Sequence, residues 1–81
     1  MKYKSKYKGS YCVYYTYKIA HVTFPSIIYG GTREQCEKYV DDYNRMSPEK
    51  YRCHLMVGQM SEIVERLTEL YNRYGMEREN K

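Results

Sequence analysis

The strongest constraint on this chain is a change in the spacing of its apolar residues. Over residues 11–19 these side chains recur at every second position, which places them on one side of a β-strand. Over residues 36–43 they recur at the i, i+3, i+4 and i+7 positions of a helix with one apolar face. A chain that changes period in this way is expected to fold as α+β, because the apolar sides of its strands and helices must cover one another.

Three strands are predicted. The first covers residues 11–19, and the second, at residues 27–29, is stopped by two glycines. A hairpin joins them, with its turn within residues 19–25. Pro25 is expected at an edge, a bulge or the turn, because proline cannot donate to a sheet. The third strand alternates apolar and polar side chains over residues 51–57.

Two helices are predicted. The first begins at Thr32, which forms a capping box with Gln35, and ends ahead of Pro48. The second has Ser61 as its N-cap and ends near Gly75. Each helix has a single apolar face, so both are expected on the same side of the sheet. The predicted fold is a two-layer β-β-α-β-α domain, in which a three-stranded sheet carries two helices on one face and leaves the other face bare. The side chains expected to face the helices are Tyr15, Tyr17, Ile19, Cys53, Leu55 and Val57. The other parity of the first strand, Cys12, Tyr14, Thr16 and Lys18, is expected on the bare face. The strand–helix–strand succession implies a parallel, right-handed crossover.

Tyrosine and positive charge are concentrated near the N-terminus. The chain of 81 residues contains 12 Tyr, one Phe and no Trp, and seven of the tyrosines lie within residues 1–29. The formal net charge is +4, yet residues 1–32 hold five lysines and no acidic residue. Residues 33–81 hold nine basic and ten acidic residues. An anionic partner is therefore expected to approach the first third of the chain.

The domain organisation follows from the same patterns. Residues 1–9 alternate lysine with tyrosine or serine and are predicted to form a flexible basic arm. If a partner made the arm extended, its lysines would lie on one side and its tyrosines, Tyr3 and Tyr7, on the other. A single domain is predicted at residues 10–76, followed by a polar tail at 77–81. We expect a cytoplasmic protein without membrane contact, since no signal-peptide pattern and no apolar run of ~20 residues is present. The odd number of cysteines indicates reduced thiols.

The predicted function is non-catalytic binding of a nucleic acid, or of a protein that handles nucleic acids. Aromatic rings on an open sheet face stack on bases, and nearby cations neutralise phosphates. Lysines of the arm would add a salt-sensitive attraction. The predicted contacts are Lys4, Lys6, Tyr7 and Lys8 in the arm, with Tyr14, Lys18, Arg52 and His54 on the bare sheet face.

Other functions stay open at this point. Tyrosine, methionine and arginine are also enriched at protein interfaces, so the chain could act by protein–protein contacts alone. In size and composition it resembles the short inhibitor proteins of phages and mobile elements, a resemblance of type that covers no motif. A homodimer through a sheet edge or the last helix is a related expectation.

Catalysis and cofactor binding are not expected. A small metal-free ribonuclease would need His54 to act with Arg52 and Lys18, and a lone histidine on a strand is weak support for such a site. The cysteine and histidine spacings match no zinc motif. Gly30 and Gly31 precede a helix but lack a phosphate-loop pattern, so they are interpreted as a tight turn.

Overall fold

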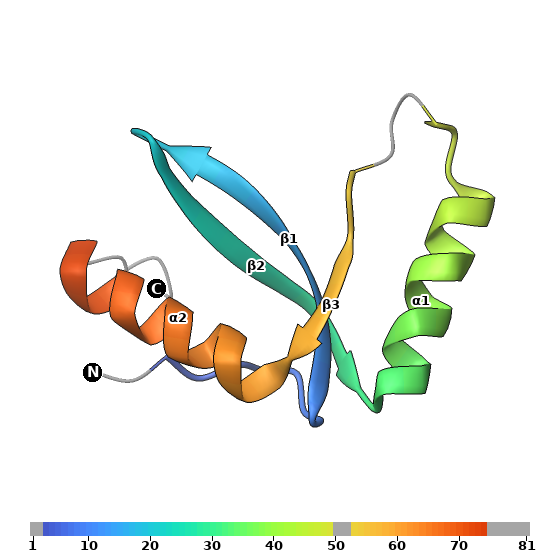
Figure 1. Ribbon diagram of the computed structural model, residues 1–81, viewed down its shortest axis with the longest axis horizontal. Helices are drawn as coiled ribbons and strands as arrows, with labels where there is room; N and C mark the ends of the chain where they lie inside the picture. Colours follow the sequence, from blue (N-terminus) through green and yellow to red (C-terminus); the bar gives the residue numbers. More distant parts are fainter. Residues whose placement is uncertain (1–2, 50–52, 75–81) are drawn as a thin grey trace.

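The computed structural model describes residues 3–49 and 53–74 (Figure 1). Its elements, in chain order, are β1 (Tyr11–Ile19), β2 (Val22–Gly31), α1 (Arg33–Met46), β3 (Met56–Gln59) and α2 (Met60–Tyr74). This confirms the predicted α+β class and the order β-β-α-β-α. Neither helix in the described part of the chain is long and apolar enough to span a membrane.

The sheet is antiparallel, with strand order β2-β1-β3, so β1 is the central strand. β1 pairs with β2 along its whole length, but with β3 only from Tyr11 to Tyr14. β2 and β3 therefore run in the same direction on either side of β1. The predicted crossover through α1 joins these two parallel strands, which are not neighbours.

The hairpin between β1 and β2 turns at Ala20 and His21, within the predicted range. Both residues have positive φ, 52° and 72°, as a two-residue hairpin loop of type I′ requires. β2 is longer than predicted and contains Pro25, which an edge strand tolerates because only one side of it must donate to the sheet. A bulge at Ile28 shifts the pairing register between the two strands.

The two helices cover opposite faces of the sheet, which corrects the predicted one-sided arrangement (Figure 1). Cys12 packs in a core with Leu67 and Tyr71 of α2. Its neighbour Val13 packs in a second core with Cys36 of α1. Adjacent strand residues point to opposite faces, so each helix has its own side of β1.

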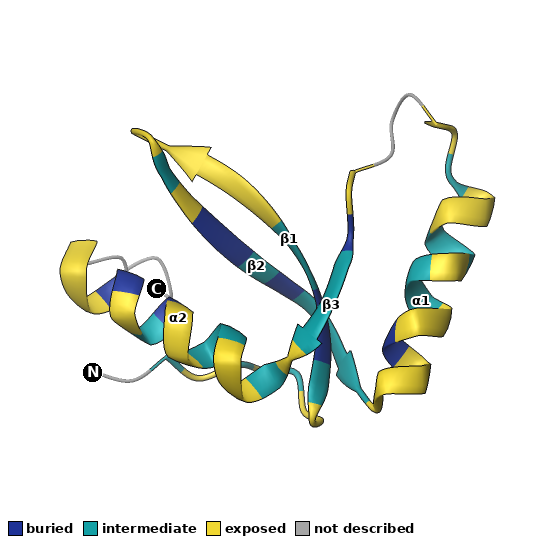
Figure 2. Cartoon of the chain, in the orientation of Figure 1, coloured by how far each residue is buried: buried dark blue, intermediate teal, exposed yellow. Residues whose placement is uncertain are grey.

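The sequence pattern did not predict that both faces of the sheet would be covered. In the first half of β1, the residues on both sides of the strand are of types that can be buried. Cys12 and Tyr14 were assigned to the bare, solvated face, yet Cys12 is fully buried and Tyr14 is half-buried beneath α2. A thiol and a phenol ring lose water as readily as aliphatic groups do. Figure 2 shows the resulting burial at the base of the sheet, while the tip of the hairpin is exposed.

The capping box of α1 is confirmed. The Gln35 N–H donates to Thr32 Oγ1 at 3.1 Å, and the Thr32 N–H donates to Gln35 Oε1 at 3.0 Å. The helix ends at Met46, ahead of Pro48, as predicted.

β3 and the start of α2 differ from their predicted bounds. β3 has four residues, and Cys53–Leu55 precede it outside the sheet, while residues 50–52 lie outside the described residues. α2 follows β3 without a loop, so Ser61 lies in its first turn rather than at an N-cap. The Met60 N–H donates instead to the Ser10 carbonyl oxygen at 2.9 Å, because the N-terminal segment passes the end of the helix.

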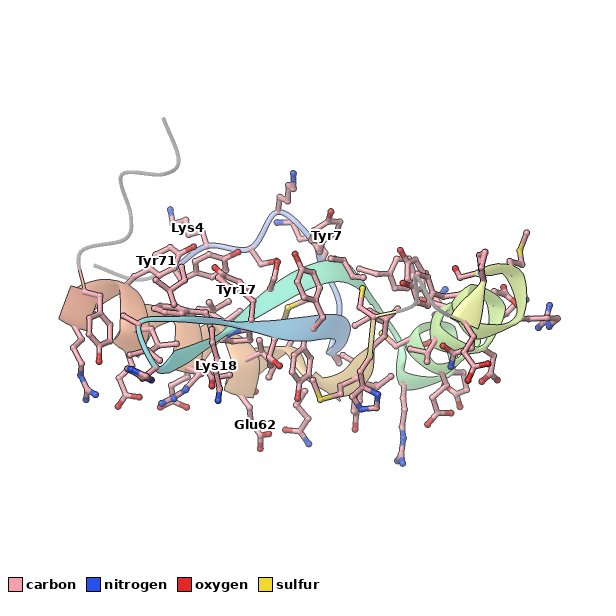
Figure 3. The ribbon with its side chains drawn as sticks, turned by 90° about the horizontal axis from the view of Figure 1, so that it is seen from above. Lys4, Tyr7, Tyr17, Lys18, Glu62 and Tyr71 are labelled. Atoms are coloured by element: carbon pink, nitrogen blue, oxygen red, sulfur yellow. The ribbon has the colours of Figure 1, made fainter. Side chains whose placement is uncertain are left out.

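The N-terminal segment, residues 3–10, lies along α2 instead of standing apart from the domain (Figures 1 and 3). The Tyr3 N–H donates to Thr68 Oγ1 at 2.9 Å, and the Tyr3 ring packs edge-on against Tyr71 at a centroid distance of 5.1 Å. Tyr7 is half-buried in the same core. The two tyrosines give this segment apolar surface to bury, which its lysines alone would not. The flexibility expected of residues 1–9 stays a prediction.

Candidate binding surface

The N-terminal segment presents a row of lysines to solvent, called here the basic row (Lys4, Lys6 and Lys8). All three are exposed, while the residues between and before them, Tyr3, Ser5 and Tyr7, are partly buried. This alternation was expected only if a partner made the segment extended. In the folded chain, α2 takes the place of that partner. The tyrosine side of the segment packs against α2, and the lysine side faces solvent.

Glycines allow the backbone of the N-terminal segment, which carries the basic row, to cross the end of β2. A Cβ atom at Gly30 would lie 2.6 Å from the Lys8 carbonyl oxygen, and one at Gly9 would collide with the Gly31 backbone. Gly9 also has φ of 137°, which favours glycine. Gly30 and Gly31 were interpreted as a tight turn before the helix. They are instead the last residues of β2 and permit close backbone approach.

The charges of the basic row differ from those on α1. Each basic residue of α1 has a carboxylate partner, in the pairs Arg33–Glu37 at 3.2 Å, Lys38–Asp42 at 3.1 Å and Arg45–Asp42 at 2.9 Å. Hydrogen bonds, first from Lys38 and then from Arg45, hold the pKa of the Asp42 carboxyl below its usual range. The basic row forms no ion pair with any described residue.

The ammonium group of Lys6 lies 5.8 Å from the centroid of the Tyr7 ring, a cation–π contact. All three charges of the row thus remain available to an anionic partner. Within the first 32 residues there is no acidic side chain to offset them.

The remaining predicted contacts that the structure describes, Tyr14, Lys18 and His54, do not join the basic row. Tyr14 belongs to the core under α2. Lys18 is exposed on β1, but Figure 3 shows it on the opposite side of the molecule from Lys4 and Tyr7. His54 is exposed before β3, in a groove beside α1, and Arg52 lies outside the described residues. No bare sheet face unites the described residues of this set, because a helix packs on each side of the first half of β1 and His54 precedes β3 outside the sheet.

The structure also does not assemble the residues imagined for a ribonuclease. The end of β1, which carries Lys18, and the segment that carries His54 diverge (Figure 1). The third residue of that set, Arg52, is outside the described part of the chain.

An aromatic cluster that the sequence analysis missed lies at the outer end of the hairpin. It consists of Tyr15, Tyr17, Phe24 and Tyr74 and is called here the aromatic cluster. Tyr17 stacks on Phe24 at 5.7 Å, and its centroid is 6.3 Å from that of Tyr15. Phe24 contacts Tyr74 of α2 at 6.0 Å. These rings form a continuous chain of contacts across both strands and the end of α2, with Phe24 buried within it.

Part of the aromatic cluster is open to solvent. The exposed fractions of Tyr17 and Tyr74 are 38% and 45%. Figure 3 shows Tyr17 on the same side as Lys4 and Tyr7. Sequence reasoning placed Tyr17 in the helix-covered core, because its parity matches that of Val13. The pairing of Tyr17 with Phe24 could have been found only by fixing the turn at residues 20–21 and counting back along both strands.

The three cysteines occupy different environments. Burial raises the pKa of the Cys12 thiol to about 11, and burial also raises that of Cys36. Cys53 was expected in the core but is exposed, because its segment leaves the sheet before β3. Its N–H donates to the Tyr43 hydroxyl oxygen at 2.9 Å. The two buried thiols act as small apolar groups rather than nucleophiles.

Comparison with protein-family models, with curated proteins and with solved structures finds no match to this chain. The functional inference is therefore drawn from the basic row and the aromatic cluster themselves.

Proposed function

We propose that this chain is a small non-catalytic binding protein that engages single-stranded nucleic acid through the basic row and Tyr17. The observation that supports it best is the basic row, three exposed lysines without ion-pair partners among the described residues. Phosphates would meet these ammonium groups in the N-terminal segment, which α2 holds in place. Ordering the segment before binding lowers the entropy lost when the nucleic acid arrives.

The exposed aromatic ring favours a single strand over a generic polyanion. Tyr17 lies on the same side as Lys4. Unpaired bases stack on such rings, with about 1–3 kcal/mol per base, whereas the bases of a duplex are already stacked on one another. A surface that combines lysines with an exposed tyrosine therefore suits a flexible strand, whose phosphates and bases can be contacted separately.

The salt dependence of binding tests this proposal. Affinity for a fluorescent single-stranded oligonucleotide should fall log-linearly with salt, because each lysine–phosphate contact releases counterions. The variant Lys4→Gln/Lys6→Gln/Lys8→Gln should reduce the slope of log affinity against log salt by about 2, at ~0.7 per lost contact. Fluorescence anisotropy across a salt series measures both quantities.

A matched control removes the same charge elsewhere. The variant Arg33→Gln/Lys38→Gln/Arg45→Gln also loses three positive charges, but on the exposed face of α1. It should keep most of the salt slope. Equal losses in the two variants would show a non-specific charge effect, and absence of binding at low salt would refute the proposal outright.

A protein partner is the alternative, favoured by an apolar groove at the end of α1. The groove has a volume of about 380 Å³ and is lined in part by Tyr39, Tyr43 and Met46. Met46 is 79% exposed, and methionine is among the residue types that are enriched at protein interfaces. A partner recovered stoichiometrically after nuclease treatment, and lost with Met46→Ser, would favour an inhibitor or adaptor of the kind found in phages and mobile elements. Both proposals place the protein in the cytoplasm, where its thiols stay reduced.

A further inference from the structure

The second half of β1 has an open edge. β3 pairs with β1 only as far as Tyr14. From Tyr15 to Ile19, β1 has β2 on one side and no third strand of the described chain on the other. Figure 1 shows the segment before β3 turning away from β1 at this point. The backbone groups of such an edge can pair with a strand from another chain.

The other long edge of the sheet is better protected. β2 carries Pro25, which lacks an N–H group, and the N-terminal segment crosses β2 at Gly30. The open edge of β1 has no proline and only one charged residue, Lys18. Its last apolar residue, Ile19, is 49% exposed. Natural edge strands usually carry such protection, so the unprotected half of β1 is suited to a partner strand.

We propose that a second copy of this chain occupies the edge, with the two β1 strands antiparallel about a twofold axis at Tyr17. In this register Tyr15 lies opposite Ile19 of the second copy, and Thr16 lies opposite Lys18 of the second copy. The two sheets would become continuous through the paired β1 strands. A twofold interface of this kind uses the same surface of both copies and closes at the dimer.

The residues of this segment are complementary to themselves in one register. Tyr15, Tyr17 and Ile19 share one parity and would meet only one another across the interface. Thr16 and Lys18 share the other parity, and neither faces a like charge. A shift of two residues in one direction would place Lys18 opposite Lys18, which is unfavourable.

A shift of two residues in the other direction would require the edge of Tyr14, which already pairs with Met56. The last helix is a weaker candidate for the dimer contact, because Leu70 is buried within its own chain. The exposed segment of β1 is complementary to itself in one register, and the edge of β2 is protected. Both observations favour a second copy of β1 as the partner strand over an unrelated strand.

Opposite charges at one position test the register. Thr16 is exposed, so its substitution leaves the packing of the single chain in place. Thr16→Lys would create two Lys–Lys pairs per dimer and raise the dimer dissociation constant about tenfold. Thr16→Glu would create two Glu–Lys pairs and lower it by about the same factor. Sedimentation velocity of nuclease-treated protein over a concentration series measures these constants.

The controls separate register from net charge. Asn72 is exposed on α2, and Asn72→Lys and Asn72→Glu change the charge equally without entering the interface. These variants should leave the dissociation constant within twofold of the unmodified protein. Circular dichroism confirms that each variant is folded.

A protein that is monomeric at millimolar concentration would overturn the proposal. So would a shift of the same sign in both Thr16 variants. Because the sedimentation measurement contains no nucleic acid, it tests the proposed dimer independently of the proposed nucleic-acid binding. The proposed dimer does not depend on the proposed function.

Discussion

The two halves of β1 have similar sequences and opposite environments. In the inner half, Tyr11–Tyr14, strands pair on both edges and a helix packs on each face. In the outer half, Tyr15–Ile19, only β2 pairs with the strand, and Tyr17 and Ile19 are exposed. Both halves are rich in aromatic and β-branched residues. The burial of a strand residue therefore depends on what covers it as much as on its type.

The inner half of β1 is expected to contribute to stability, and the outer half to binding. The two cores meet at the inner half, so most of the apolar area removed from water lies there. The outer half carries the exposed part of the aromatic cluster and the open edge. Three changes should test this division, in order of decreasing expected effect.

The largest effect is expected from Leu67→Ala in α2. Leu67 is buried against Cys12 and Ile27, and loss of its side chain leaves a cavity that costs about 3 kcal/mol. That approaches the whole stability expected of so short a chain. Ile19→Ala, in the outer half, should cost about 1 kcal/mol or less. Urea unfolding at low protein concentration measures both, and equal losses would contradict the division.

The next effect is a loss of stability at high pH through Cys12. Its pKa is about 11 in the folded protein, against 9.0 for an ordinary thiol. Between these values the unfolded chain releases a proton that the folded chain keeps, so the free energy of unfolding falls as pH rises. The loss should reach about 2 kcal/mol at the upper end of this range.

Paired variants isolate this thiol from the other groups that titrate at high pH. Cys12→Ala should be less sensitive than the unmodified protein to pH between 9 and 11, whereas exposed Cys53→Ala should retain the full dependence. If all three proteins lose stability in parallel, Cys12 does not carry the effect.

The smallest effect concerns the tip of the hairpin. Ala20 and His21 both adopt positive φ, which asparagine and glycine accept more readily. Ala20→Asn/His21→Gly should therefore stabilise the protein by about 1 kcal/mol. Thermal unfolding measures the gain. A decrease in stability would mean that the turn has a different geometry in solution.

Much of the fold was predictable because local patterns carried it. The capping box at Thr32 and the stop at Pro48 set the limits of α1, and both are seen. The hairpin turn lies within its predicted range. The start of α2 was wrong at Ser61 because its first N–H finds a partner in the distant Ser10. No local signal could reveal that contact.

The binding surface was predictable only in part. The alternation of lysine and tyrosine predicted Lys4, Lys6 and Lys8 on one side and Tyr7 on the other only for an extended segment held by a partner, and packing on α2 produces this arrangement within the chain. The predicted bare sheet face was wrong, since the parity of β1 did not indicate which faces the helices would cover. Tyr14 entered the core, while Tyr17, of the supposedly buried parity, is partly exposed.

The elements and their order follow from local patterns in the sequence. These depend on spacing, caps and turn residues within a few positions of one another. Three features emerge only in the folded chain: the helices lie on opposite faces of the sheet, the N-terminal segment lies on α2, and half of β1 keeps an open edge. Each of these results depends on contacts between residues distant in sequence, and the apolar side of one element does not specify which other element will cover it.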